Sequence, residues 1–298
     1  MRHIIPISGK DSCATAIVQM ALHPELEYEL FFNDIGSELP ETYAWLDLVE
    51  KKLGKPITRV GKSLEEVIFK HGILPSAHVR FCTRESKIEP MEKYIGKELA
   101  TIYFGIRADE DRVGYQSMKH NIIPVYPLKE NGLDLSAIYS ILDKHELRPP
   151  KFFWNRLYSI VSAKLDKKHA NGFFKLSSSV DVFAKMPPQV FDDLFAWRSR
   201  SNCYFCFFQR LYEWVGLLEH HPKLFDRAQE IEESVGNDEQ EKPFTWNQGH
   251  SLSKIRKNAD RILVKRAVQI LRFIENRRTD QYLPDMLALT SCGLFCGK

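Results

Sequence analysis

Short apolar runs alternate with segments of helical spacing over the first half of the chain. The run from His3 to Ile7 precedes apolar residues at helical spacing from Ala14 to Ala21, and the next run spans Tyr28 to Phe32. Further strands are expected at 56–60, 101–106 and 122–126, and further helices at 39–53, from Ser63, and at 135–147. This alternation predicts an α/β fold, a parallel sheet flanked by helices on both sides.

The pattern changes near Pro149-Pro150. Helical spacing then dominates, and Ser253 to Arg278 is predicted to be one long helix with its apolar residues near one face. We therefore predict an α/β domain over 1–149 and a mainly helical C-terminal region over 150–298 that carries cysteines.

Composition excludes several classes of protein. The 298 residues are 44% hydrophobic, which is enough for a large core, and the net charge of +3 is too balanced to indicate nucleic-acid binding by itself. No apolar run approaches the roughly 18 residues of a membrane span, and Pro6 and Lys10-Asp11 interrupt the N-terminal apolar stretch, so we expect a cytoplasmic protein without a membrane contact. In that compartment the six cysteines favour free thiols, metal ligands or redox chemistry over disulfides.

The loop Ser8-Gly9-Lys10-Asp11-Ser12 separates the first predicted strand from the first predicted helix. The start of a helix presents backbone N–H groups and partial positive charge, Lys10 adds a cation, and Ser8 and Ser12 add hydroxyls. The loop is therefore a candidate phosphate or pyrophosphate site, although it lacks the Walker A spacing. The alternative is an ordinary strand-to-helix turn with a serine cap.

Two further segments carry polar side chains suited to a nucleotide. Asn33 to Thr42 follows the second strand, and its Asp34 and Glu38 are candidates to accept hydrogen bonds from a ribose or an adenine amino group; the alternative is a turn with an acidic helix start. His78 to Pro90 is basic, and its Arg84 and Lys87 are candidates to meet phosphate or sulfate oxygens; the alternative is a solvated basic loop.

The segment Gly105 to Arg112 directly follows a predicted buried strand. Arg107 and Arg112 are candidates to hold a polyphosphate. Asp109 and Glu110 are candidates to bind Mg²⁺, which prefers hard oxygen ligands.

In order and spacing these segments resemble the phosphoadenosine-phosphosulfate reductase family of the PP-loop, or adenine-nucleotide α-hydrolase, superfamily. The resemblance rests on Ser8–Ser12, on Asp34-Ile35-Gly36 with Glu38 and Pro40-Glu41-Thr42, on Arg80-Phe81-Cys82-Thr83 with Lys87-Ile88-Glu89-Pro90, and on Gly105-Ile106-Arg107-Ala108-Asp109-Glu110. It covers roughly residues 1 to 150, and Arg198–Phe207 and His221–Phe225 also look like segments of less-studied branches. The loop is one glycine short of the PP-loop pattern Ser-Gly-Gly-x-Asp-Ser, or Ser8 stands in for that glycine.

The resemblance implies ATP as ligand, with Mg²⁺, and cleavage between the α- and β-phosphates to AMP and pyrophosphate. It places the leaving pyrophosphate on the PP-loop and Lys10, and it gives Asp11 the role of orienting the loop or the metal. The expected catalytic residues are Lys10, Asp11, Arg107 and Cys82. The expected nucleotide- and Mg²⁺-binding residues are Ser8, Gly9, Lys10, Asp11, Ser12, Asp34, Glu38, Arg84, Lys87, Arg107, Asp109, Glu110 and Arg112.

Two close cysteine pairs lie in the second half. Cys203-x2-Cys206 and Cys292-x3-Cys296 would together form a tetrahedral thiolate site for Zn²⁺ or a [4Fe–4S] cluster, and their spacing does not choose between these two or exclude a protein without metal. The family resemblance favours the iron–sulfur cluster.

The other cysteines are assigned separately. Cys82 is a candidate ligand or sulfur-handling thiol, because arginine neighbours lower a thiol pKa; otherwise it is a half-buried loop residue. Cys13 is expected in the core. Ser291-Cys292-Gly293-Leu294-Phe295 only partly matches the Glu-Cys-Gly-Leu-His segment of the reductases, which argues for Cys292 as a ligand and against a plain sulfate-nucleotide reductase.

The helix expected at 253–278 is rich in Lys and Arg and is a candidate contact for DNA or RNA, or else a solvated face. The resemblance is strongest to the ATP pyrophosphatase of DNA phosphorothioation, which works with a cysteine desulfurase and other modification-complex proteins. The alternatives are an adenylyl-sulfate or phosphoadenylyl-sulfate reductase, a tRNA thiolation enzyme, and a non-catalytic nucleotide sensor of a defence complex.

Overall fold

The computed structural model describes residues 1–171, 178–235 and 244–276. Its contacts divide the chain into two compact units. The first comprises residues 1–150 with 201–203, and the second comprises 151–200 and the described residues from 204 onward. Each unit is described by itself.

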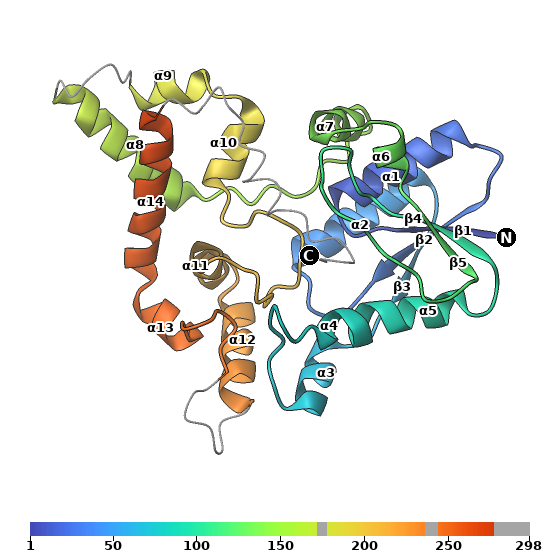
Figure 1. Ribbon diagram of the computed structural model, residues 1–298. Coiled ribbons are helices and arrows are strands. Elements are labelled where there is room, and N and C mark those ends of the chain that lie inside the picture. The colour runs from blue at the N-terminus through green and yellow to red at the C-terminus, as the bar shows by residue number, and fades with distance from the viewer. Residues whose placement is uncertain (172–177, 236–243, 277–298) are drawn as a thin grey trace. The chain divides into compact units, whose positions relative to one another are not determined.

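A five-stranded parallel sheet forms the centre of the first unit (Figure 1). Its strands are β1 (Arg2–Pro6), β2 (Tyr28–Asn33), β3 (Ile57–Val60), β4 (Ala100–Tyr103) and β5 (Ile122–Val125), in the order β3-β2-β1-β4-β5. β1 pairs with both β2 and β4, with Ile4 opposite Glu29 on one side and Ile102 on the other. The fold class predicted from the sequence is therefore confirmed.

Helices cover both faces of this sheet. They are α1 (Lys10–Leu22), α2 (Pro40–Leu53), α3 (Leu64–His71), α4 (Phe81–Thr83), the π-helix η1 (Arg84–Ile88), α5 (Glu89–Ile95), α6 (Pro127–Glu130) and α7 (Leu135–Lys144). Local signals in the sequence set several of their ends. The Ser63 hydroxyl caps α3 by accepting from the Glu66 N–H, and Gly54 ends α2 in the left-handed conformation.

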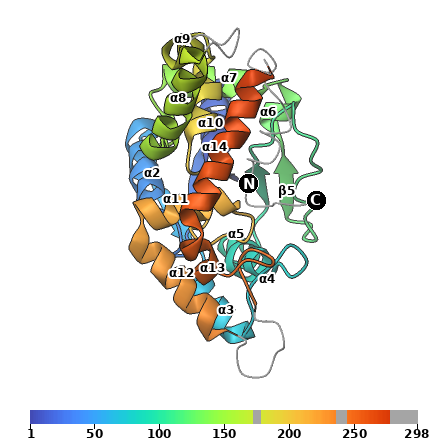
Figure 2. The same cartoon turned by 90° about the vertical axis from the view of Figure 1, so that its left-hand side faces the viewer.

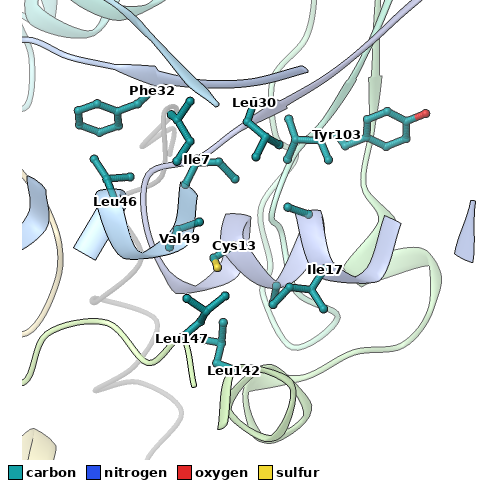
Figure 3. Packing of buried hydrophobic residues seen from close by; sticks show 14 of the residues in the cluster. Ile7, Cys13, Ile17, Leu30, Phe32, Leu46, Val49, Tyr103, Leu142 and Leu147 are labelled. Atoms are coloured by element: carbon teal, nitrogen blue, oxygen red, sulfur yellow. The ribbon is translucent and has the colours of Figure 1, made fainter. Parts of the chain in front are cut away.

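The hydrophobic core has one part on each face. α1, α2 and α7 bury Ile17, Trp45 and Leu142 against one face, and Figure 3 shows Cys13 in the same cluster as Ile17 and Leu142. Met91 and Ile95 of α5 pack on the other face with Phe31. Cys13 is fully buried, and burial raises the pKa of its thiol to about 12, so this cysteine is an uncharged core residue as expected.

The second unit is helical over its described residues (Figure 2). Its helices are α8 (Asn155–Ala170), α9 (Ser179–Ala184), α10 (Pro188–Phe195), α11 (Leu211–His220), α12 (Pro222–Ser234), α13 (Leu252–Lys257) and α14 (Ala259–Glu275). Trp154, Trp214 and Trp246 are among its largest buried side chains. No described helix of the protein is both long and apolar enough to cross a membrane.

Two predicted elements differ from the structure. The long helix expected at 253–278 is broken at Asn258, whose side chain and N–H both bond to the Lys254 carbonyl and end α13 before α14 begins. The helix ends at Glu275, and 277 and 278 lie outside the described residues. The strand expected at 101–106 ends at Tyr103, because Gly105 leaves the sheet and lies against the start of α1.

Candidate functional site

The Ser8–Ser12 loop follows β1 at the carboxyl edge of the sheet. In the sheet, β1 lies between β2 and β4. The chain continues from β1 to β2 on one side of β1 and from β3 to β4 on its other side, so β1 and β4 form the topological switch point. Ligands of open parallel sheets bind in the crevice at such a point. The loop therefore occupies the position in the fold where a ligand is expected.

The Ser12 hydroxyl organises this loop from within. It accepts from the N–H groups of Ser8 at 2.9 Å and Gly9 at 3.1 Å, and it donates to the Gly9 carbonyl at 3.0 Å. Among the described residues no acceptor is found for the N–H groups of Lys10, Asp11 and Ser12, which form the first turn of α1. The loop thus presents three backbone donors and the positive end of a 13-residue helix.

Gly105 fixes how closely β4 and the loop approach each other. A Cβ atom at this position would lie 2.6 Å from both the Asp11 carbonyl carbon and the Ser12 nitrogen, which no side chain tolerates without a backbone shift. Gly9 is different, because a Cβ there would meet nothing within 4 Å. The loop is therefore packed tightly from the β4 side and open at Gly9.

Arg107 is the centre of an ion-pair cluster beside the loop. Its side chain is 2% exposed, and its Nη1 lies 3.1 Å from Asp11 Oδ1 and 2.8 Å from Glu110 Oε1, while its Nε donates to Asp109 Oδ1 at 2.9 Å. Burial alone would lower the pKa of Arg107, but the charges of these carboxylates outweigh burial and raise that pKa above its ordinary value. Arg107 is therefore a fixed cation that positions three carboxylates.

Lys10 and Arg112 extend the cluster at its two ends. Lys10 Nζ lies 3.4 Å from Asp11 Oδ2, and Arg112 Nε donates to Glu110 Oε2 at 2.9 Å. The structure thus joins six of the residues predicted from two separate motifs into one network of three cations and three carboxylates. These residues are Lys10, Asp11, Arg107, Asp109, Glu110 and Arg112.

The acidic loop after β2 forms a second group. Asp34 Oδ1 accepts from the Tyr43 hydroxyl at 2.8 Å and from the Gly36 N–H at 3.0 Å, and its Oδ2 lies 3.8 Å from Arg59. Burial, followed by the Asp34 carboxylate, raises the pKa of Tyr43 above its ordinary value. Asp34 therefore holds its own loop in shape, and Glu38 lies half-buried in the same loop.

Asn33, the last residue of β2, was not singled out from the sequence. It is 4% exposed, and neither its amide nitrogen nor its amide oxygen has a hydrogen-bond partner among the described residues. Burying an amide without a partner costs about 1–3 kcal/mol, so such groups call for an explanation. The only signal in the sequence was its place next to Asp34 at a strand end.

The basic segment 78–90 is helical from Phe81 onward. Arg84 and Lys87 lie in the π-helix η1, where Arg84 Nε pairs with Glu89 at 3.2 Å and is largely exposed. Glu85 anchors this segment to α3 through Lys70 at 2.8 Å and His71 at 2.5 Å. Cys82 lies in α4, half-buried, with its sulfur 4.0 Å from the Thr83 hydroxyl. π-Helical turns often occur at functional sites.

Half of the predicted metal-binding cysteine set can be located. Cys203 is buried and Cys206 is half-buried, and the two lie close to a turn where the Gln209 N–H donates to the Cys206 carbonyl. Cys292 and Cys296 lie outside the described residues. The described part of the chain contains no group of three or more His, Cys, Asp or Glu suited to a metal. Cys203 and Cys206 would supply two of the four thiolate ligands of an iron–sulfur or zinc site.

Three comparisons with known proteins each match part of the chain. Residues 2–159 match the model of the phosphoadenosine phosphosulfate reductase domain family. An uncharacterized protein of Methanocaldococcus jannaschii is 35% identical over 89 residues, which are 29% of this chain and only 18% of that protein. A crystal structure of phosphoadenylyl-sulfate (PAPS) reductase from Candida auris, a phosphate complex, matches with 18% identity and a TM-score of 0.37 over 50% of this chain and 74% of that one.

Proposed function

The chain belongs to the phosphoadenosine phosphosulfate reductase domain family, and on this premise we propose that it is a PP-loop ATP pyrophosphatase. In this proposal ATP is cleaved between its α- and β-phosphates to AMP and pyrophosphate. The cleavage activates a nucleic acid for sulfur incorporation, with DNA phosphorothioation as the favoured reaction and a cysteine desulfurase as the sulfur-supplying partner.

The observation that carries the proposal is the loop at the switch point. The N–H groups of Lys10, Asp11 and Ser12, which find no acceptor in the described part of the chain, and the Lys10 ammonium are the donors that a pyrophosphate group requires. As the Pα–O bond breaks, negative charge accumulates on the leaving pyrophosphate. Donors that are already in place stabilise that charge without reorganisation, which is the main catalytic contribution in such transfers.

The ion-pair cluster supplies the neighbouring part of the proposed site. Asp109 and Asp11 are the carboxylates best placed to contact Mg²⁺ through oxygen, because Asp109 is 39% exposed and Asp11 lies within the loop. When bound, Mg²⁺ neutralises phosphate charge. Arg107 holds both carboxylates in place and acts as a positioning residue, a refinement of its expected role as a direct phosphate ligand.

The acceptor completes the proposed reaction. An oxygen of the nucleic acid attacks the α-phosphorus, the bond to the bridging oxygen breaks, and pyrophosphate leaves with the bonding electrons. A sulfur nucleophile then displaces AMP. Cys82 lies within the basic segment 78–90 and is the proposed sulfur-handling residue. The four cysteines Cys203, Cys206, Cys292 and Cys296 would hold a [4Fe–4S] cluster, or Zn²⁺ instead, which supplies redox or structural chemistry when bound.

The proposal is tested by incubating the anaerobically purified protein with Mg²⁺–ATP and separating AMP from pyrophosphate and ADP. Lys10→Ala should lower the rate of AMP formation by about 10²–10³-fold, the usual effect of removing one transition-state donor. Lys51→Ala is the matched control, because Lys51 is an exposed lysine on α2 and its loss should leave the rate unchanged. ATP that stays intact with the wild-type protein in the presence and absence of DNA would refute the pyrophosphatase assignment.

The family match favours one second candidate, a reductase acting on an adenylyl sulfate. That enzyme would bind the same phosphate groups but would release sulfite with a thiol reductant and would not turn over ATP. The same wild-type preparation therefore separates the two functions, since sulfite release from adenylyl sulfate without AMP formation from ATP identifies the reductase.

A further inference from the structure

Positive charge is concentrated on three helices of the second unit. α8, α13 and α14 together carry eleven Lys and Arg and only three Asp and Glu, an excess of eight positive charges. The whole chain has a net charge of only +3, so the remainder of the protein is net negative. Such segregation costs self-repulsion and favours an anionic partner at the basic face.

Exposed cations lie on both α13 and α14. On α14, Arg261, Lys265 and Arg272 recur at spacings of four and seven residues, which places them on a common face of that helix, and the exposed Lys254 and Lys257 lie three residues apart on α13, before the break at Asn258. These five residues define the basic face. None of them forms an ion pair within the described part of the chain, so their charges are available to a partner.

The acidic residues of α14 do not neutralise this face. Asp260 pairs with Arg156 of α8 at 2.5 Å, and Glu275 pairs with Lys168 of the same helix, which packs beside α14 (Figures 1 and 2). Both carboxylates are therefore already occupied by cations of α8. Ion pairing within the unit uses the acids and leaves the basic face unbalanced.

Two other cations of these helices have roles inside the protein. Arg256 pairs with Asp226 and stacks on Phe225 with its guanidinium 4.8 Å from the ring centroid. Arg266 is 8% exposed, lies 4.4 Å over the Tyr212 ring, and has its pKa lowered by burial. A count of basic residues in the sequence therefore overestimates the number of cations on the basic face, because Arg256 and Arg266 contact groups within the protein.

We propose that the basic face binds the phosphate backbone of a duplex nucleic acid. That the anionic partner is a nucleic acid rests on the proposed function, whereas the excess of positive charge on the face is independent of that function. At 1.5 Å per residue Arg261 to Arg272 extends over about 16 Å, a length over which a duplex presents roughly nine phosphate charges. The exposed residues of α13 and α14 include no aromatic side chain on which unpaired bases would stack, and this favours a duplex over a single strand.

The test measures binding of a fluorescent 30-base-pair DNA duplex by anisotropy, without ATP, over a series of salt concentrations. The triple variant Lys257→Gln, Arg261→Gln, Lys265→Gln should bind about 10–100-fold more weakly, and its plot of log affinity against log salt should be less steep by about 2.7, or 0.9 per lost contact. The control variant Lys51→Gln, Lys93→Gln, Lys97→Gln removes the same charge from exposed lysines of the first unit and should stay within about twofold of wild type.

Equal losses in the two triple variants, or no duplex binding by the wild type at 50 mM salt, would overturn the proposal. Tighter binding to phosphatidylserine vesicles than to duplex, lost in the same variant, would reassign the face to a membrane. Similar binding of an RNA duplex supports a backbone contact, and tighter binding of a single strand contradicts it. Lys10→Ala should bind the duplex normally, and the face variant should cleave ATP normally without DNA, so the failure of one proposal is distinguishable from the failure of the other.

Discussion

At the scale of single residues, Asn33 gives the sharpest link between stability and binding. Among the described residues its buried amide has no partner, and it ends β2, the neighbour in the sheet of the strand that leads into the Ser8–Ser12 loop. Both amide atoms are closed to solvent, so a ligand can reach them only if the adjoining loops shift. An asparagine amide offers a donor and an acceptor that match the N6 and N7 edge of adenine.

We therefore expect Asn33→Leu, which keeps the branched shape and the number of side-chain heavy atoms and removes the unpaired amide, to leave the melting temperature of the ligand-free protein unchanged or higher. The same change should weaken ATP binding by about 10–100-fold, corresponding to about 1–3 kcal/mol for a lost bidentate base contact. Thermal melting measures the expected effect on stability, and calorimetric titration measures the expected effect on ATP affinity. A variant that melts lower and binds ATP normally would make Asn33 a purely structural residue.

From the sequence alone, the segments that carry the candidate phosphate site could be predicted better than the role of each of their residues. The segments around Asp11 and Arg107 were chosen as phosphate ligands because of their residue types, and the structure joins them in one cluster. That Arg107 is buried against three carboxylates could not be inferred, because burial depends on how Gly105 packs β4 against the loop. Pairings across 96 residues of sequence have no local pattern.

At the scale of elements, the Glu85 contacts make the attachment of η1 to α3 dependent on pH. The hydrogen bond from Lys70, followed by that from His71, lowers the pKa of Glu85 to about 2 from the ordinary 4.5. A carboxyl with a lowered pKa stabilises the folded state at pH values above its unfolded pKa, and this contribution is lost as the pH falls from about 4.5 toward 2.

Glu85→Gln should therefore melt below the wild type at pH 7, and the gap in melting temperature should narrow as the pH is lowered from 5 toward 3. Glu89→Gln is the control, because it also removes a carboxylate next to this π-helix. The partner of Glu89 is the largely exposed Arg84, and such exposed ion pairs contribute little to the stability of the folded state. Melting curves followed by circular dichroism at several pH values measure both gaps. A Glu85→Gln gap that stays constant with pH would contradict the ion-pair explanation.

The regular elements were predictable where local signals agree with packing. β1, β2, β3 and β5 begin and end within a residue or two of the apolar runs, because β1 and β2 are largely buried in the parallel sheet and the edge strands β3 and β5 each bury their first residue. The division of the expected 253–278 helix was missed, because Asn258 interrupts a pattern whose apolar spacing continues across the break. The π-helix η1 was missed as well, since no sequence signal marks a wider turn.

At the scale of the whole molecule, the net charge hides how unevenly positive and negative charges are distributed along the chain. A net charge of +3 does not by itself indicate a nucleic-acid partner, yet that value is the sum of a strongly basic group of helices and a net negative remainder. The two compact units thus carry different chemistry, with phosphate donors and a balanced ion-pair cluster in one and unpaired cations in the other. Each ligand should therefore protect a different part of the chain.

Amide hydrogen exchange followed by mass spectrometry tests this division. Mg²⁺ with a non-hydrolysable α,β-methylene analogue of ATP should slow exchange in peptides covering 8–12 and 105–112, because binding to the folded state suppresses local opening by RT ln(1 + [L]/Kd), about 2.7 kcal/mol at 100 times Kd. Removing Mg²⁺ with EDTA should abolish most of this protection, since the three cations of the cluster are already matched by three carboxylates and leave the triphosphate charge uncompensated. A DNA duplex alone should instead slow exchange in 252–275. Protection of 252–275 by the ATP analogue with none in 8–12 would place the nucleotide outside the proposed site.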